Sequence, residues 1–234
     1  IDVNFISISS GETALTSAIK SQRIDIIKLL INDPRTNFNL ANTNYESPLN
    51  LAVQKNNLEI VKLLLSVPSI NPYLYDKNYR TSLMIAANQM NLPIINEIIS
   101  FSGKNIIYHK ESVDFLLETL IRAIPRNNNQ NNNFYNGNMK NKKYTDEDVI
   151  ETLNMLLSID DIQMIFDEKS QIHFLNMFSN KNIDIKLIQT FINDDKFDLS
   201  SFSPKTGNTP LISVLKEERI DIAKLLINDP RTNI

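Results

Sequence analysis

Cysteine is absent from the sequence, and only 4 of its 234 residues are glycine. The lack of cysteine excludes a disulfide framework, a thiolate zinc site and a cysteine nucleophile. It also fits a reducing compartment, so we expect a cytoplasmic protein. Four glycines are too few for a phosphate cradle, and no dinucleotide-binding, P-loop, Gly-x-Ser-x-Gly or His-Glu-x-x-His pattern occurs. These absences argue against the common nucleotide-binding and hydrolytic sites.

The sequence also lacks a basic excess and any long hydrophobic run. Its 24 lysines and arginines face 27 aspartates and glutamates, for a formal net charge of -3. This balance gives no surplus that would attract phosphate backbones, so we expect no nucleic acid partner. No apolar stretch approaches the roughly 18 to 20 residues that span a bilayer, so we expect no membrane insertion. With 42% hydrophobic residues, the chain nevertheless has material for a sizeable core.

Residues suited to acid–base or metal chemistry are few and scattered. The two histidines, His109 and His173, lie far apart in sequence and have no acidic or serine partner in a recognisable motif. We expect both to have structural or solvated roles. The acidic pairs at 160–161 and 194–195 most simply belong to loops that follow helices. We therefore expect no enzyme activity, no cofactor and no metal.

An internal repeat of 34 residues organises the sequence. One leucine of a short motif recurs at positions 15, 49, 83 and 117, then at 175 after one period plus a 24-residue insertion, and finally at 211. About nine residues beyond each leucine lies a second apolar segment, such as 58–65 or 92–99. Periods of this length indicate stacked supersecondary units rather than an ordinary globular domain.

The segments of each unit have a helical pattern. Leu58, Val61, Leu64 and Leu65 line one face of a helix, with charged residues on the other. Good N-cap residues precede the first segments, namely Thr13, Ser47, Thr81 and Thr209. Polar stretches with an apolar pair, such as Ile106 and Tyr108, connect the units and are expected to form hairpins. Helices this short are marginal alone, so the pairs must pack on one another in a solenoid.

The string Gly207-Asn208-Thr209-Pro210-Leu211 and the apolar segment that follows it resemble the ankyrin repeat, whose motif opens with Gly-x-Thr-Pro-Leu-His. The resemblance implies an all-α solenoid of helix-turn-helix repeats with short interrepeat β-hairpin loops. It covers almost the whole chain and is strongest in four segments: 11–33, 45–68, 79–101 and 207–230.

On this register we expect one array over residues 1–234. Residues 1–10 end a preceding unit, and about six units follow: 11–44, 45–78, 79–112, 113–170 with an insertion at 125–147, 171–206 and 207–234. Residues 23–37 and 219–233 are identical at 14 of 15 positions, which indicates a recent duplication. Because neither end carries a polar capping repeat, we expect the chain to be part of a longer array.

Two departures from the ankyrin motif bear on the expected structure. The motif histidine is replaced, so the hydrogen bonds that it makes between neighbouring repeats in the family cannot be carried over. Its positions are taken by Thr16, Asn50, Met84 and Ile212. Tyr45 and Tyr79 occupy the glycine position, where a positive φ is costly for a residue with a Cβ. We therefore expect altered geometry in those two hairpins.

The insertion at 125–147 is rich in asparagine and lysine. Its composition favours a disordered polar loop. The alternative is a docking segment that folds on binding, with Phe134, Tyr135 and Tyr144 as candidate anchors. A new helix is expected after Thr145, a good N-cap residue followed by three acidic residues.

The family resemblance implies binding of a partner protein through the concave face of the array, which is built from hairpin tips and first helices. In the family, the contact positions flank the glycine position of each repeat and lie at the end of its first helix. Carried over to this sequence, and with the two tyrosines at the glycine position added, they give nine candidate residues: Tyr45, Glu46, Lys55, Asn78, Tyr79, Arg80, Gln89, Asp114 and Arg122. Tyrosine and arginine tend to dominate interface energies, so we place the centre of the site at Tyr45, Tyr79 and Arg80. The alternative role for the tyrosines is packing within the hairpins.

A second class of function also fits the sequence. The array could be a structural or self-associating spacer within a longer multi-repeat or multidomain protein. Uncapped end repeats would expose apolar faces through which copies could associate.

Overall fold

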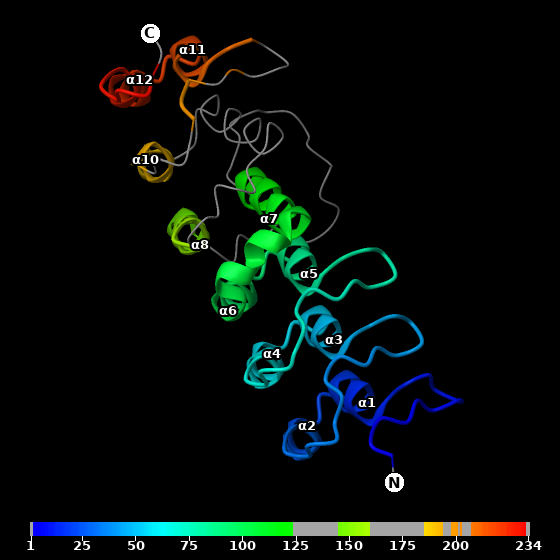
Figure 1. Cartoon of the computed structure of the whole chain (residues 1–234). Coiled ribbons are helices and arrows are strands. Elements are labelled where there is room, and N and C mark those ends of the chain that lie inside the picture. Colours follow the sequence, from blue (N-terminus) through cyan, green and yellow to red (C-terminus); the bar gives the residue numbers. More distant parts are fainter. Residues whose placement is uncertain are drawn as a thin grey trace. The chain divides into compact units, whose positions relative to one another are not determined.

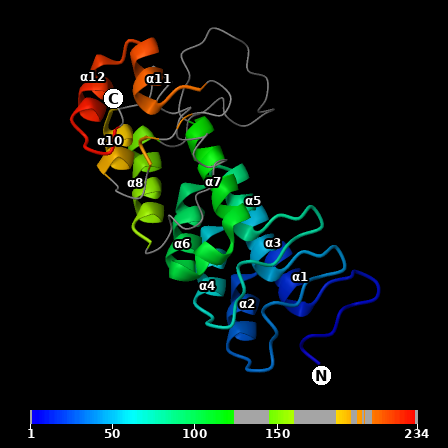
Figure 2. The same cartoon turned by 45° about the horizontal axis from the view of Figure 1, so that its top comes forward.

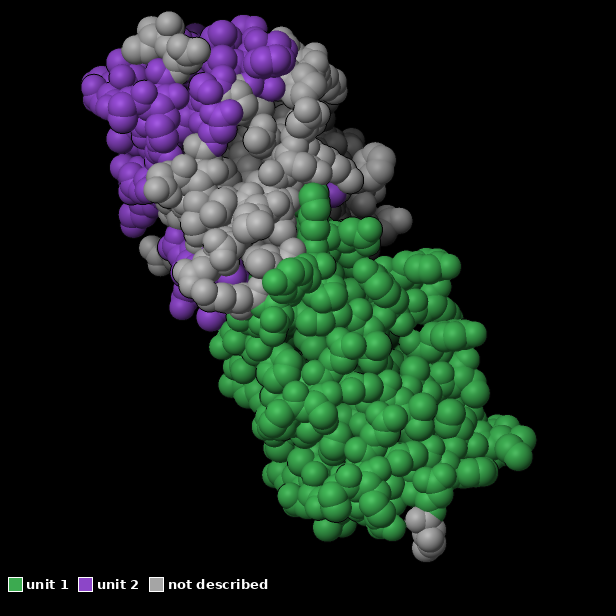
Figure 3. All heavy atoms as spheres, viewed as in Figure 1, with its two compact units in different colours: residues 1–116 green, residues 117–234 purple. Residues whose placement is uncertain are grey.

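The computed structural model describes residues 2–123, 145–159, 185–193, 198–200, 202 and 207–232. The chain divides into two compact units, residues 1–116 and residues 117–234, and each is described by itself (Figure 3). Three features predicted from the sequence lie outside the described residues: the insertion up to residue 144 with its three aromatic anchors, His173, and the acidic pairs at 160–161 and 194–195.

The first unit is a stack of helix pairs. Its paired helices are α1 (Ala14–Lys20), α2 (Ile24–Ile31), α3 (Pro48–Gln54), α4 (Leu58–Leu65), α5 (Ser82–Asn88) and α6 (Leu92–Ser102). The first helices pack in the order α1, α3, α5 and the second helices in the order α2, α4, α6, so they form two rows (Figure 1). The loops that precede α1, α3 and α5 project from the same side of the stack in both views (Figures 1 and 2).

The predicted N-caps define the starts of the first helices. The Thr13 hydroxyl accepts a hydrogen bond from the backbone N–H of Thr16 at 3.1 Å, and the Thr16 hydroxyl accepts one from the N–H of Thr13 at 2.8 Å. This reciprocal capping box satisfies two donors that the helix itself leaves unpaired. Single side-chain caps start α3, α5 and α11 (Pro210–Lys216), made by Ser47, Thr81 and Thr209. These predictions are confirmed.

The second helices bury one face against the helix pair before them. Ile60 of α4 and Ile94 of α6 occupy the same position of the repeat, and both are 0% exposed. Ile26 holds that position in α2, beside which no earlier helix lies in the described residues, and it is 36% exposed. Burying one isoleucine side chain stabilises a fold by about 1.5–3 kcal/mol. Stacking of neighbouring repeats is therefore a large part of what holds each short helix in place.

The turn between the two helices of each pair contains a residue with a left-handed backbone. Gln22, Asn56 and Met90 are spaced by 34 residues and have φ values of 53°, 57° and 51°. The next residue then returns to the first helix, as where the N–H of Arg23 donates to the carbonyl of Ala18 at 2.9 Å. Glycine is the usual residue at such a helix end. The turn is therefore set by the helix-end hydrogen bonds rather than by glycine.

The third repeat ends differently from the prediction. α6 continues past the predicted end at Ile99, and a 3-10 helix, η1 (Gly103–Tyr108), follows it. Ile106 and Tyr108 thus lie in a helical turn, and the expectation of a hairpin there is wrong. α7 (Lys110–Ala123) begins directly afterwards, and its first turn contains an ion pair between Lys110 and Asp114 at 2.8 Å. Such an i, i+4 pair favours helix where the hairpin was expected.

The second unit contains the rest of α7, then α8 (Asp146–Leu157), α10 (Ile185–Asn193), α11 and α12 (Ile220–Ile227). α12 packs on both α10 and α11. The predicted cap at Thr145 is confirmed, because its hydroxyl accepts a hydrogen bond from the N–H of Asp148 at 3.2 Å. In the described part of the chain, no helix is both long enough and apolar enough to cross a membrane.

Candidate protein-binding loops

Two loops of the first unit end in the same tight tip, and we call them the tyrosine loops. They are residues 42–46, with Tyr45 at the tip, and residues 76–80, with Tyr79 at the tip. In each loop the N–H of the first residue donates to the carbonyl of the last, at 3.1 Å and 2.9 Å, and the tyrosine N–H donates to the carbonyl of the first residue, at 3.0 Å in both. None of the described residues forms a strand, so the predicted β-hairpins are tight reversals without a ladder of backbone pairs.

The first side chain of each loop holds the tip. Oδ1 of Asn42 accepts hydrogen bonds from the backbone N–H groups of Asn44 and Glu46, at 2.9 Å and 3.0 Å. Oδ1 of Asp76 accepts the equivalent two bonds in the second loop, at 2.8 Å and 3.0 Å. Asparagine and aspartate are the residues best suited to such turns. The backbone that presents each tyrosine is thus fixed by a side chain three residues earlier.

Tyr45 and Tyr79 keep the backbone that glycine has in the other loops. Their φ values are 62° and 58°, against 69° for Gly11 and 68° for Gly207. The expectation of altered geometry at the tyrosines is therefore wrong. The tip bonds hold the loop in one conformation, and the residue at the tip adopts a left-handed backbone whether or not it has a Cβ. For a residue with a Cβ, that conformation costs about 1–2 kcal/mol.

The tyrosine rings do not recover this cost by packing. Tyr45 is 69% exposed and Tyr79 is 83% exposed, which contradicts the alternative that they serve to pack the hairpins. Tyr73 provides the contrast, because it is half-buried and stacks on His109 with ring centroids 3.4 Å apart and an angle of 11°. Burial lowers the pKa of His109, in keeping with the structural role expected for it. Exposed polar residues such as Gln22 and Asn56 also have a left-handed backbone, so the feature that distinguishes the two tips is the large exposed aromatic ring on each.

Arg80 braces its own loop. Its Nε and Nη2 donate to Oδ2 of Asp76 at 3.1 Å and 2.7 Å. Burial alone would raise the pKa of Asp76, but the hydrogen bonds from the Arg80 side chain and from the N–H groups of Arg80 and Asn78 outweigh it. The pKa of this carboxyl therefore lies below its usual range. Arg80 belongs to the support of the tip, and only part of its side chain faces solvent.

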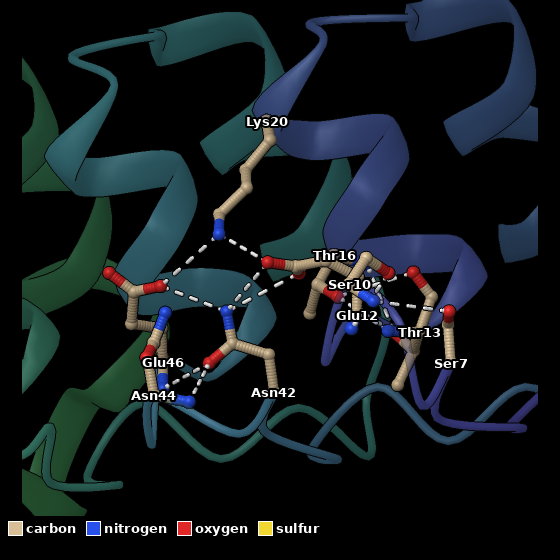
Figure 4. Close-up of polar contacts among 9 residues, drawn as sticks. All are labelled: Ser7, Ser10, Glu12, Thr13, Thr16, Lys20, Asn42, Asn44 and Glu46. Atoms are coloured by element: carbon tan, nitrogen blue, oxygen red, sulfur yellow. Dashed lines mark hydrogen bonds and ion pairs between the residues drawn. The ribbon is translucent and has the colours of Figure 1, made fainter.

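A polar cluster of Glu12, Lys20, Asn42 and Glu46 links the first tyrosine loop to the repeat before it (Figure 4). The Lys20 ammonium lies between two carboxylates, bonded to Glu12 and 3.7 Å from Glu46. Nδ2 of Asn42 donates to Oε2 of Glu46 at 2.8 Å and reaches Oε1 of Glu12 at 3.2 Å. Burial acts to raise the pKa of Glu12, but hydrogen bonds from Lys20, Thr16 and Asn42 hold it below its usual range. The cluster thereby joins the loops of two neighbouring repeats.

The other predicted site residues have different surroundings. Lys55 and Gln89 end α3 and α5 on the exposed surface, and the Gln89 amide donates to the carbonyl of Gln54 at 3.2 Å. Asp114 lies inside α7 rather than at a tip, because the hairpin predicted there is replaced by helix. Arg122 lies in the last turn of α7, in the second unit, and its side chain is outside the described part of the chain.

One replacement of the motif histidine still links neighbouring repeats. Asn50 is 1% exposed, and its Nδ2 donates to the carbonyl of Leu74, in the loop of the next repeat, at 3.0 Å. Met84 at the same position is buried but apolar, and Ile212 is 41% exposed. Asn50, which the sequence analysis named only as a replacement of the motif histidine, thus makes a hydrogen bond between the second repeat and the next that was not predicted.

Sequence reasoning also missed a pair of asparagine bridges between loops. Oδ1 of Asn4 accepts from the N–H of Asn37 at 2.7 Å while its Nδ2 donates to the carbonyl of Arg35 at 2.8 Å. Asn39 repeats this arrangement one repeat later with Asn71 and Ser69, at 2.7 Å and 2.8 Å. Asn37 and Asn71 follow the 34-residue period, but the bridging residues Asn4 and Asn39 are 35 residues apart, so the strict period did not reveal the bridges. Part of the asparagine excess thus has a structural use.

Stacked helix pairs with loops projecting from one side define a helical-repeat protein. Residues 34–109 match the family model for ankyrin repeats, in three copies. This part of the chain therefore matches ankyrin repeats, as the sequence motifs predicted, and the described helices have the ankyrin repeat fold. Ankyrin repeats generally serve as protein–protein interaction modules and typically act as non-enzymatic scaffolds.

Among the solved structures similar to the chain, one with a TM-score above 0.5 supports the fold. The chain is similar to EF0377, an ankyrin repeat protein, with a TM-score of 0.60 and 15% identity, over 94% of this chain and 98% of that one. A chain of the complex between the predatory endopeptidase Bd0816 of Bdellovibrio bacteriovorus and the immunity protein Bd3460 gives a TM-score of 0.48 and 19% identity, over 92% and 97%. An ankyrin repeat domain of Acinetobacter baumannii AYE gives 0.45 and 14%, over 91% and 95%. No curated protein sequence matches the chain.

Proposed function

We propose that the chain is an interaction scaffold whose tyrosine loops bind a partner protein. The observation that supports this most is the pairing of strain with exposure at Tyr45 and Tyr79. Each adopts a left-handed backbone, and each leaves most of its ring in solvent. Neither folding nor packing accounts for tyrosine there, whereas an interface does, because rigid aromatic rings carry much of the binding energy at protein surfaces.

The supporting residues keep the tips preorganised. Asn42 and Asp76 fix the loop backbones, and Arg80 and the Lys20 cluster hold those two side chains. A surface that is already rigid loses less conformational entropy on binding. We therefore narrow the nine candidate residues to Tyr45 and Tyr79 as contacts. Glu46 and Arg80 support the loop backbones. Lys55, Asn78 and Gln89 lie at the margin of the proposed contact surface.

Alanine substitution with a matched control tests this proposal. Tyr45→Ala and Tyr79→Ala are each expected to weaken binding to a partner about tenfold, which corresponds to about 1.4 kcal/mol. Tyr108→Ala is the control, because Tyr108 is 79% exposed in the same unit but lies in η1, away from the tips. Equal affinities for all three variants and the parent chain, with circular dichroism unchanged, would contradict the proposal.

A structural or self-associating spacer is the second candidate. Leu29 of α2 is 72% exposed, and Ile220 and Ile227 of α12 are 65% and 48% exposed. These apolar side chains could bring copies together. Light scattering over a range of concentrations tests this. Assembly that Leu29→Lys abolishes would favour the spacer, and a monodisperse monomer at all concentrations would reject it. The cytoplasmic location and the absence of catalysis remain predictions.

A further inference from the structure

The two tyrosines repeat along the stack at the spacing of packed helices. Tyr45 and Tyr79 are 34 residues apart, and their loops lead into α3 and α5, which pack directly on each other (Figure 1). Helices in contact lie about 8–10 Å apart. Because the two loops lead into these helices in the same way, we take the same interval for the two rings, and a ligand that touches both would present equivalent groups at about this spacing.

Only some backbone conformations repeat at this interval. A polyproline II segment advances about 3.1 Å per residue with three residues per turn, so its equivalent side chains recur every 9.3 Å or so. A β-strand brings side chains to one face about every 6.6–6.8 Å, which is too short. An α-helix brings residues seven apart to one face at about 10.5 Å. Spacing alone leaves polyproline II and α-helical ligands.

The surface around the rings favours the polyproline II ligand. The neighbours of the tyrosines within the loops are exposed polar residues, namely Thr43, Asn44, Lys77 and Asn78. An amphipathic helix needs a continuous apolar groove for its apolar stripe. A polyproline II segment has no internal hydrogen bonds, so its carbonyls need donors. The amides of Asn44 and Asn78, the ammonium of Lys77 and the tyrosine hydroxyls can supply them.

We propose that the tyrosine loops recognise an extended segment in the polyproline II conformation, with two prolines three residues apart, each packed on one tyrosine ring. This rests on the proposed function, since it names the ligand of the same loops. Proline suits the site because its ring offers a flat apolar face. Its fixed φ also lowers the entropy that the ligand loses on binding. Two tips give one ring contact per turn of the ligand.

Peptide selection on the immobilised 234-residue chain tests the spacing. Three libraries of equal length are compared, with prolines at i and i+3, with prolines at i and i+2, and with leucines at i and i+7 in a helix-favouring background. We expect enrichment of the i, i+3 library alone. Fluorescence polarisation of the selected peptides should show about tenfold weaker binding to Tyr45→Ala and to Tyr79→Ala, and unchanged binding to Tyr108→Ala.

The outcomes separate the two proposals. Enrichment of the helical library, or enrichment that ignores proline spacing, overturns the polyproline II ligand. If no library is enriched but binding of a folded partner still depends on both tyrosines, the polyproline II proposal is also overturned. In that case the proposed function stands. If substitution of the tyrosines affects no ligand of any kind, both proposals fail.

Discussion

Replacing Tyr79 by glycine and by alanine separates the strain of the tip from the contribution of the ring. Alanine keeps the Cβ and with it the left-handed cost of about 1–2 kcal/mol at a φ of 58°. Glycine removes that cost. It also gives the unfolded chain more conformational freedom, which offsets about 0.5–1 kcal/mol of the stability gained. The free energy of unfolding should therefore be about 0.5–1 kcal/mol higher for Tyr79→Gly than for Tyr79→Ala. Both variants lose the ring equally.

Urea denaturation of the 234-residue chain measures this difference. The control site is Ser17, which is exposed in the middle of α1, where Ser17→Gly should be about 1 kcal/mol less stable than Ser17→Ala. The order of the two variants should thus reverse between the helix and the tip. If Tyr79→Gly is the less stable of the pair, the tip is not strained, and the argument from strain to function fails.

Three further predictions concern the support of the loops. Because the pKa of Asp76 is lowered in the folded state, its carboxylate stabilises the fold above about pH 4, and this stabilisation is lost as the pH falls below that. In Asp76→Asn the free energy of unfolding, measured by denaturation, should therefore depend less on pH in the acid range. Lys20→Met should lower the free energy of unfolding by about 1–2 kcal/mol at pH 7, and by less as the pH falls below about 4, because the folded pKa of Glu12 is lowered; unchanged stability would reject the cluster. Asn50→Ala should lower the free energy of unfolding by about 1–3 kcal/mol, whereas Lys55→Ala should leave it unchanged.

Repetition made the helices predictable. The period of 34 and the N-cap residues such as Thr13 and Ser47 give the helix starts, because capping depends on one side chain and the next turn of backbone. The second helices begin and end as expected where they are bounded by good signals, as in α2 and α4. Local chemistry repeated several times is the most reliable signal in a solenoid.

The tips and the third loop were not predictable in the same way. The left-handed backbone of Tyr45 depends on the hydrogen bonds that Oδ1 of Asn42 accepts from the backbone N–H groups of Asn44 and Glu46, and this role of Asn42 becomes visible only in the folded loop. The helix that replaces a hairpin before Asp114 depends on Gly103 and on a pair with Lys110, neither of which belongs to the repeat motif. Exposure of the rings is a property of the stack, so the packing alternative could be rejected only in three dimensions.

The double variant Tyr45→Gly/Tyr79→Gly tests the central claim most directly. It removes both rings and places glycine where Gly11 and Gly207 already have the same backbone, so the fold should be retained. Quantitative affinity capture would compare it with the parent chain and with Tyr108→Ala. The account predicts that proteins held by the parent chain and by Tyr108→Ala are lost from the folded double variant. Retention of the same proteins at the same level by all three chains would contradict it.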